Sequence, residues 1–112
     1  MNQKNAIHLT TLYKKKKFSY TGNVSTGTTI TYGKGHTVDV NANVYKGLVG
    51  RFRGQTVDIG ASRTKPMPGS IGEWLQNTAK IKTAVASYVA PILVNAGLAT
   101  IVKQKNVIKI KF

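Results

Sequence analysis

Residues Ile71–Val102 read IGEWLQNTAKIKTAVASYVAPILVNAGLATIV, and this stretch decides the fold. It opens with the pattern of a helix N-terminus, because Ser70 can cap the first turn and Glu73 follows three residues later. The apolar residues that follow lie on one helical face: Ile71, Trp74 and Leu75. We therefore predict a short helix that begins at Ile71 and is broken by Asn77 and Thr78.

A second, longer helix is predicted from Lys80 to Asn95. Its apolar residues recur at spacings of three and four: Ile81, Val85, Tyr88, Val89, Ile92, Leu93 and Ala96. Pro91 lies inside this helix, so we expect a kink or a local break near residues 87–90. Gly97 is placed to end the helix in the left-handed conformation.

Beyond Gly97 the period of the apolar residues changes from that of a helix to that of a strand. Residues 98–102 are strand-like, and residues 103–106 form a polar turn. In the last segment Ile108, Ile110 and Phe112 alternate with Lys109 and Lys111. This alternation predicts a C-terminal β-hairpin with one apolar and one basic face.

Upstream, residues 38–60 fit two patterns. Val38 to Val44 alternate like a half-buried strand, but a helical stripe begins at Val44 and continues to Phe52. Asn41 or Asn43 could cap such a helix, and Gly47 and Gly50 would weaken it by about 1 kcal/mol each. We favour a helix over residues 43–53, then a short strand over 55–59 and a loop over 61–69.

Residues 1–40 have a different composition. A run of four lysines, Lys14, Lys15, Lys16 and Lys17, is flanked by Tyr13, Phe18 and Tyr20. Threonine and aromatic residues favour strands, while the glycines and Asn23 favour turns, so we predict two or three short strands. The alternative is a flexible basic arm that becomes ordered on its ligand.

Charge is the most unusual property of the chain. Its 112 residues carry 17 Lys and Arg against 3 acids, a net charge of +14, and residues 74–112 contain no acid. Most of these cations lack an acidic partner, so they repel one another, and a polyanion relieves this repulsion. Nucleic acid is the expected partner, although the lysines could also be ordinary solvent-exposed charges.

Composition also excludes several classes of site. The sequence has no cysteine, which excludes disulfides and thiolate zinc sites, and with two histidines and three acids we expect neither metal nor cofactor. Its apolar stretches are far shorter than the ~20 residues that span a bilayer, and the N-terminus lacks the apolar core of a signal peptide. We therefore expect a cytoplasmic protein without a membrane partner.

From residue 43 onward the predicted order is helix, short strand, helix, turn, helix and hairpin. This order, with the NAGLA exit of residues 95–99 into the hairpin, resembles the winged-helix version of the helix-turn-helix. We therefore predict an α+β fold, with a basic β-rich segment over 1–40 and a winged-helix-like domain over 41–112, together one compact unit.

The resemblance implies a role for each basic segment. The helix over residues 80–96 would be the recognition helix, and the hairpin would be the wing that lies over the DNA backbone. Outward-facing residues near the start of that helix would contact DNA: Lys80, Lys82, Thr83 and Ser87. The wing would contribute Lys103, Lys105 and Asn106 at its tip and Lys109 and Lys111 on its basic face.

Two further groups are candidates for nucleic-acid contact. The run Lys14–Lys17 with its aromatic neighbours suits phosphates and stacked bases. The arginines are Arg51, Arg53 and Arg63, and we expect them to contact the phosphate backbone rather than base edges.

The sequence thus predicts a non-enzymatic protein that binds double-stranded DNA, with DNA favoured over RNA. Its small size and charge suit a regulator or architectural factor of a phage or mobile element, associated with the nucleoid. A structured-RNA binder of ribosomal type is an alternative. An exposed edge of the hairpin could pair two copies into a homodimer.

A small metal-free ribonuclease of the toxin type is the enzymatic alternative. His8 or His36 would be its general base, with His36 favoured, and Asp39 would either orient His36 or cap the following helix. Arg51, Arg53 or a lysine would stabilise the transition state.

Overall fold

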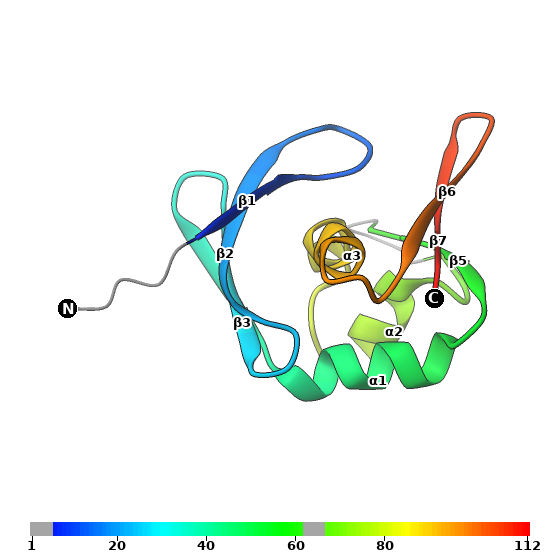
Figure 1. The fold of residues 1–112 in the computed structure, drawn as a ribbon, viewed down its shortest axis with the longest axis horizontal. Helices are drawn as coiled ribbons and strands as arrows, with labels where there is room; N and C mark the ends of the chain where they lie inside the picture. The colour runs from blue at the N-terminus through cyan, green and yellow to red at the C-terminus, as the bar shows by residue number, and fades with distance from the viewer. Residues whose placement is uncertain (1–5, 62–66) are drawn as a thin grey trace.

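Two antiparallel sheets enclose one helix in the computed structural model, which describes residues 6–61 and 67–112 (Figure 1). The first sheet has the order β1-β2-β3-β4, and its strands are β1 (Ile7–Thr10), β2 (Lys17–Asn23), β3 (Gly27–Tyr32) and β4 (His36–Val40). The second has the order β5-β7-β6, and its strands are β5 (Thr56–Asp58), β6 (Thr100–Gln104) and β7 (Val107–Lys111). The helices are α1 (Ala42–Phe52), α2 (Ile71–Asn77) and α3 (Ala86–Asn95), with a 3₁₀ turn η1 (Thr83–Val85) before α3. The predicted α+β class is confirmed.

The first sheet is an antiparallel meander with one apolar and one polar face. Phe18, Tyr20 and Ile30 alternate along β2 and β3 and are buried, whereas Ser19 and Thr31 between them lie on the other face. Because it has its own apolar face, the segment over residues 6–40 folds onto the rest of the chain. The segment has four strands, where two or three were predicted.

The helix predicted over 43–53 and the strand predicted over 55–59 are both present, as α1 and β5. The side chain of Asn41 accepts a hydrogen bond from the amide of Asn43 at 2.9 Å and so caps α1. Tyr45, Leu48 and Phe52 form its buried face. The strand-like pattern upstream is also real, because β4 continues to Val40 immediately before this cap.

The cap of α2 also follows the prediction. Ser70 Oγ accepts a hydrogen bond from the amide of Glu73 at 3.2 Å, and Glu73 Oε1 accepts one from the amide of Gly69 at 2.9 Å. The glutamate thus reaches one residue further back than in the usual capping box. The helix ends at Asn77, as the sequence indicated.

The start of the second predicted helix is wrong. Lys80 has a φ of 59°, which is incompatible with a right-handed helix, and the amide of Ile81 donates to the carbonyl oxygen of Leu75 at 2.9 Å. The chain therefore turns at residues 80–82, and α3 begins only at Ala86. It then continues to Asn95 with Pro91 inside it, so of the kink or local break predicted there, the break is wrong.

The C-terminal hairpin follows the prediction closely. Gly97 has a φ of 78°, and the amide of Leu98 donates to the carbonyl oxygen of Leu93 at 3.0 Å, which together end α3 in a Schellman motif. Gln104 pairs with Val107, so the turn is shorter than the predicted one and contains Lys105 and Asn106.

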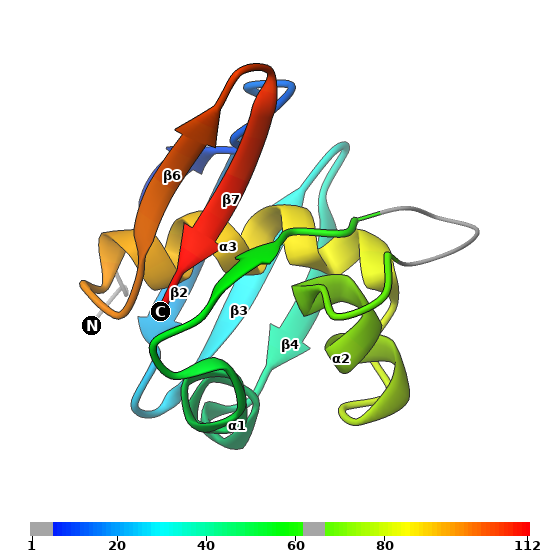
Figure 2. The same ribbon diagram turned by 90° about the vertical axis from the view of Figure 1, so that its right-hand side faces the viewer.

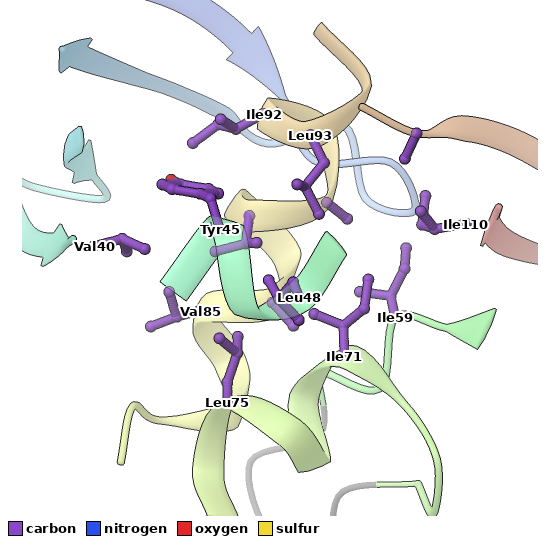
Figure 3. Close-up of a cluster of buried hydrophobic side chains, with 14 of the residues drawn as sticks. Val40, Tyr45, Leu48, Ile59, Ile71, Leu75, Val85, Ile92, Leu93 and Ile110 are labelled. Atoms are coloured by element: carbon purple, nitrogen blue, oxygen red, sulfur yellow. The ribbon is translucent and has the colours of Figure 1, made fainter. Parts of the chain in front are cut away.

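Helix α3 lies between the two sheets and carries the centre of the hydrophobic core (Figures 1 and 2). Ile92 and Leu93 of α3 are fully buried, as are Leu48 of α1 and Ile110 of β7, and Figure 3 shows that Ile92 points to the other side of α3 from Ile110. The first sheet is fixed to α3 by polar and aromatic contacts as well. Asn95 Nδ2 donates to Tyr20 Oη at 3.1 Å, and the ring of Tyr88 stacks on that of Tyr32 with 4.8 Å between centroids.

Candidate nucleic-acid interface

Helix α3 has no open face of the kind that a recognition helix needs. Its buried residues occur all around the helix: Ala86, Val89, Ala90, Pro91, Ile92 and Leu93. Thr83, which we expected to face outward, is only 5% exposed, and Ser87 is half-buried. The first sheet packs against one side of α3 and the second sheet lies on the other (Figures 1 and 2). The near-continuous apolar run from Ala84 to Val94 is the sequence feature that could have indicated burial on every side.

Lys80 and Lys82 are exposed, but they lie in the turn between α2 and η1 rather than on a helix. The directions of these two side chains therefore cannot be predicted from the period of a helix, about 3.6 residues. The expectation that Lys80, Lys82, Thr83 and Ser87 share the outer face of one helix is wrong.

The lysine run and the hairpin turn lie at the same end of the molecule. Both the loop between β1 and β2 (residues 11–16) and the turn between β6 and β7 are at the top in Figures 1 and 2. Their exposed cations are Lys14, Lys15 and Lys16 on the loop and Lys103 and Lys105 on the hairpin. We call these five lysines the basic fork. Lys17 is the first residue of β2 and lies on the outer face of the sheet, since its neighbour Phe18 faces the core.

Tyr13 joins the β1–β2 loop to the β6–β7 hairpin, the two segments that carry the basic fork. Its hydroxyl accepts a hydrogen bond from the amide of Ile108 at 2.7 Å and donates one to the carbonyl oxygen of the same residue at 3.1 Å. β5 pairs with β7 as far as the Asp58–Lys109 pair, so the tyrosine occupies the edge of β7 just beyond the end of β5. The contact links segments 95 residues apart in the sequence.

The base of the loop is closed by two hydrogen bonds between Thr11 and Lys16. The amide of Thr11 donates to the carbonyl oxygen of Lys16 at 2.9 Å, and the amide of Lys16 donates to Thr11 Oγ1 at 3.0 Å. The three lysines of the loop therefore project from a closed hairpin end rather than from a loose segment.

The register of the hairpin divides its lysines between two faces. Lys103 pairs with Ile108 and so shares the face of the buried Ile110. Lys109 and Lys111 lie on the opposite face, as their alternation predicted, and Asp58 is the cross-strand neighbour of Lys109. Lys103 therefore belongs to the side of the hairpin that is turned toward the core and the β1–β2 loop.

The arginines lie elsewhere. Arg51 is on the last turn of α1 with its guanidinium 5.0 Å from the centre of the Phe52 ring, and Arg53 follows it. The Phe52 ring in turn packs against Phe112, which follows the end of β7 remote from the hairpin turn. Both arginines are thus at the opposite end of the second sheet from the basic fork. Arg63 lies outside the described residues.

The structure does not join His36 to Asp39. His36 is exposed opposite Tyr32, with ring centroids 5.6 Å apart, whereas Asp39 lies on the other face of the strand and accepts a hydrogen bond from Thr29 Oγ1 at 2.8 Å. Because Asn41 caps α1, Asp39 is not the cap either. Within residues 6–61 and 67–112, no three side chains of the metal-binding types gather into a possible metal site.

The same two ranges contain no helix that is long and apolar enough to cross a membrane. Comparison of the chain with protein-family models, with curated proteins and with solved structures finds no match.

Proposed function

We propose that this protein binds nucleic acid without catalysis, through contacts between the basic fork and the phosphate backbone. The observation that carries the proposal is the pair of hydrogen bonds between Tyr13 and Ile108, which hold the two lysine-bearing hairpins beside each other. When the β1–β2 loop and the β6–β7 hairpin are held together, their lysines can contact neighbouring phosphates of one strand. Such contacts position a protein on nucleic acid.

The charge distribution supports this assignment. The chain carries a net charge of +14, and none of its three acids belongs to the β1–β2 loop or the β6–β7 turn, although Asp58 is the cross-strand neighbour of Lys109. When exposed lysines contact a polyanion, counterions are released from it, and this release favours binding.

The winged-helix resemblance gives partial support. Residues 42–111 have the expected order of elements, and β5 joins the hairpin in one sheet. Since α3 is buried, we assign the contacts to the hairpin and the β1–β2 loop rather than to a helix in the major groove. We therefore expect binding with little sequence preference, because phosphate contacts carry no direct information about the base sequence.

The test is a salt series of binding measurements with labelled duplex DNA, single-stranded DNA and structured RNA. With duplex DNA we expect a slope of log affinity against log salt that corresponds to about five phosphate contacts. In the fork variant, Lys14→Gln, Lys16→Gln and Lys103→Gln are combined, and the magnitude of this slope should fall by about 3.

The matched control removes the same amount of charge at the far end of the molecule. It combines three changes at exposed positions of α1 and its C-cap: Lys46→Gln, Arg51→Gln and Arg53→Gln. We expect the control to keep the slope of the original protein. Equal losses in the two variants would show that net charge alone drives binding, and absence of binding to all three nucleic acids would refute the proposed function.

A further inference from the structure

A cavity of about 440 Å³ opens between the β1–β2 loop, residues 59–61 and the beginning of α3. This volume is within the range of small-molecule sites, about 300–1,000 Å³. Leu12 and Ile59 contribute apolar walls, Ser87 contributes a hydroxyl group, and Tyr13 and Tyr88 contribute aromatic rings. The cavity therefore combines the flat apolar surfaces and polar groups that a planar heterocycle requires.

Tyr13 is the most distinctive part of the wall. Its side chain is 53% exposed, yet its hydroxyl is held at both the amide and the carbonyl of Ile108. The other two aromatic residues beside the lysine run, Phe18 and Tyr20, are each only 4% exposed and belong to the core. An exposed ring with a fixed orientation is a ready stacking surface, because little conformational freedom is lost when a base packs on it.

The opposite aromatic wall is also fixed. The ring of Tyr88 stacks on Tyr32 at 4.8 Å and meets Phe18 edge-on at 5.1 Å between centroids. These two ring contacts hold Tyr88 in place beside the cavity.

Charge determines which heterocycles suit this cavity. Lys14 and Lys16 line it and are exposed, and the described residues of the lining include no carboxylate. A planar group that carries an anion at a short distance satisfies both the aromatic walls and the lysines. Nucleotides have this chemistry, with the base as the planar group and the phosphate as the anion.

We propose that this cavity receives one unpaired nucleotide, with its base against the ring of Tyr13 and its phosphate on Lys14 and Lys16. This inference rests on the proposed function and makes it more specific. A base inside a continuous duplex is stacked between its neighbours and cannot enter a cavity, so the preferred ligand is a single strand or an unpaired end.

The test measures base-dependent binding directly. The probe is a short single-stranded DNA that contains one 2-aminopurine, whose fluorescence falls when it stacks, and the comparison strand has an abasic site at that position. With the original protein we expect quenching of the probe and about tenfold weaker binding of the abasic strand.

Three variants separate stacking from charge and from folding. Tyr13→Phe keeps the ring but loses the hydrogen bonds to Ile108 that orient it, so it should still quench the probe while binding the strand more weakly, whereas Tyr13→Leu should lose the quenching. Ala84→Leu fills the cavity from η1 and should also lose it with Tyr13 in place. Ala84→Leu leaves the hydrogen bonds of Tyr13 and all five lysines of the basic fork in place, so it should not change the salt slope. Thermal unfolding of each variant confirms that it is folded.

The outcomes distinguish this inference from the proposed function. Equal binding of the intact and abasic strands, or quenching that persists in both leucine variants, would overturn the cavity proposal and leave backbone binding in place. Absence of binding to either strand would refute both. Adenosine 5′-monophosphate is tested separately, and binding of it as tight as that of the strand would show that the site serves free nucleotides.

Discussion

At the scale of single residues, Gly72 leaves no room for a side chain beside the backbone of Gly60. A Cβ atom on Gly72 would lie 1.9 Å from the carbonyl oxygen of Gly60, and the amide of Gly72 donates to the carbonyl oxygen of Ile59 at 2.9 Å. Because backbone cannot move aside as a flexible side chain does, Gly72→Ala should lower the free energy of unfolding by about 2–3 kcal/mol. Urea unfolding measures this change.

Gly50→Ala is the matched control. Gly50 lies in α1, and a Cβ atom there would meet nothing within 4 Å. The same substitution should therefore raise the free energy of unfolding by about 0.5–1 kcal/mol, through helix propensity alone. If the two substitutions changed stability alike, the contact between Gly60 and Gly72 would not restrict the structure as described.

A second prediction at this scale concerns pH. Burial of the Tyr45 phenol raises its pKa from 10.0 to about 12, against the smaller opposing effect of its 2.6 Å hydrogen bond with Thr28. Between these two values the unfolded chain loses the proton more readily than the folded one. The contribution of Tyr45 to stability is therefore complete below pH 10 and is lost as the pH rises toward 12.

Comparison with Tyr45→Phe isolates this effect. The variant should lose about 1 kcal/mol at neutral pH, since Thr28 is left without its buried partner. Between pH 10 and 12 the original protein should lose about 1–3 kcal/mol more than the variant does. Chemical unfolding at a series of pH values measures the difference, in which the titration of the lysines cancels. A difference that is constant with pH would mean that Tyr45 ionises as freely in the folded protein as in the unfolded chain.

At the scale of elements, the sequence predicted those parts that depend on local chemistry. Ser70 and Glu73 marked the start of α2, Gly97 marked the end of α3, and the alternation after residue 107 marked the hairpin. The start of α3 could not be found in this way. Ile81 fits the helical spacing of the residues that follow, but the left-handed conformation of Lys80 is set by packing against α2, which leaves no trace in the periodicity.

The arrangement of elements explains which part of the interface could be predicted. Charge alone identified the lysines of the β1–β2 loop and of the hairpin as two basic segments. The two segments lie side by side because Tyr13 contacts Ile108. No local sequence pattern connects residues so far apart in the chain. For the same reason the packing of the first sheet on α3, which removes the expected recognition surface, was not apparent until the fold was known.

At the scale of the whole molecule, the net charge of +14 opposes folding and favours binding at the same time. Cations that repel one another in the compact state destabilise it, and salt weakens this repulsion. A bound polyanion stabilises the folded state by mass action, about 2.7 kcal/mol at a hundredfold excess over the dissociation constant, and salt weakens this stabilisation instead. We therefore expect added salt to raise the melting temperature of the free protein and to lower the further increase that single-stranded DNA produces.

The basic fork should be the main source of both effects. Combined substitution of Lys14, Lys15 and Lys16 by glutamine should raise the melting temperature of the free protein at low salt, because three adjacent cations are removed. The same variant should lose most of the stabilisation by DNA. Its melting temperature should therefore be higher than that of the original protein without DNA and lower with DNA. Thermal unfolding of both proteins, with and without the DNA, measures this reversal. If the variant were more stable with DNA as well as without it, these lysines would contribute only repulsion, and the polyanion would bind at another surface.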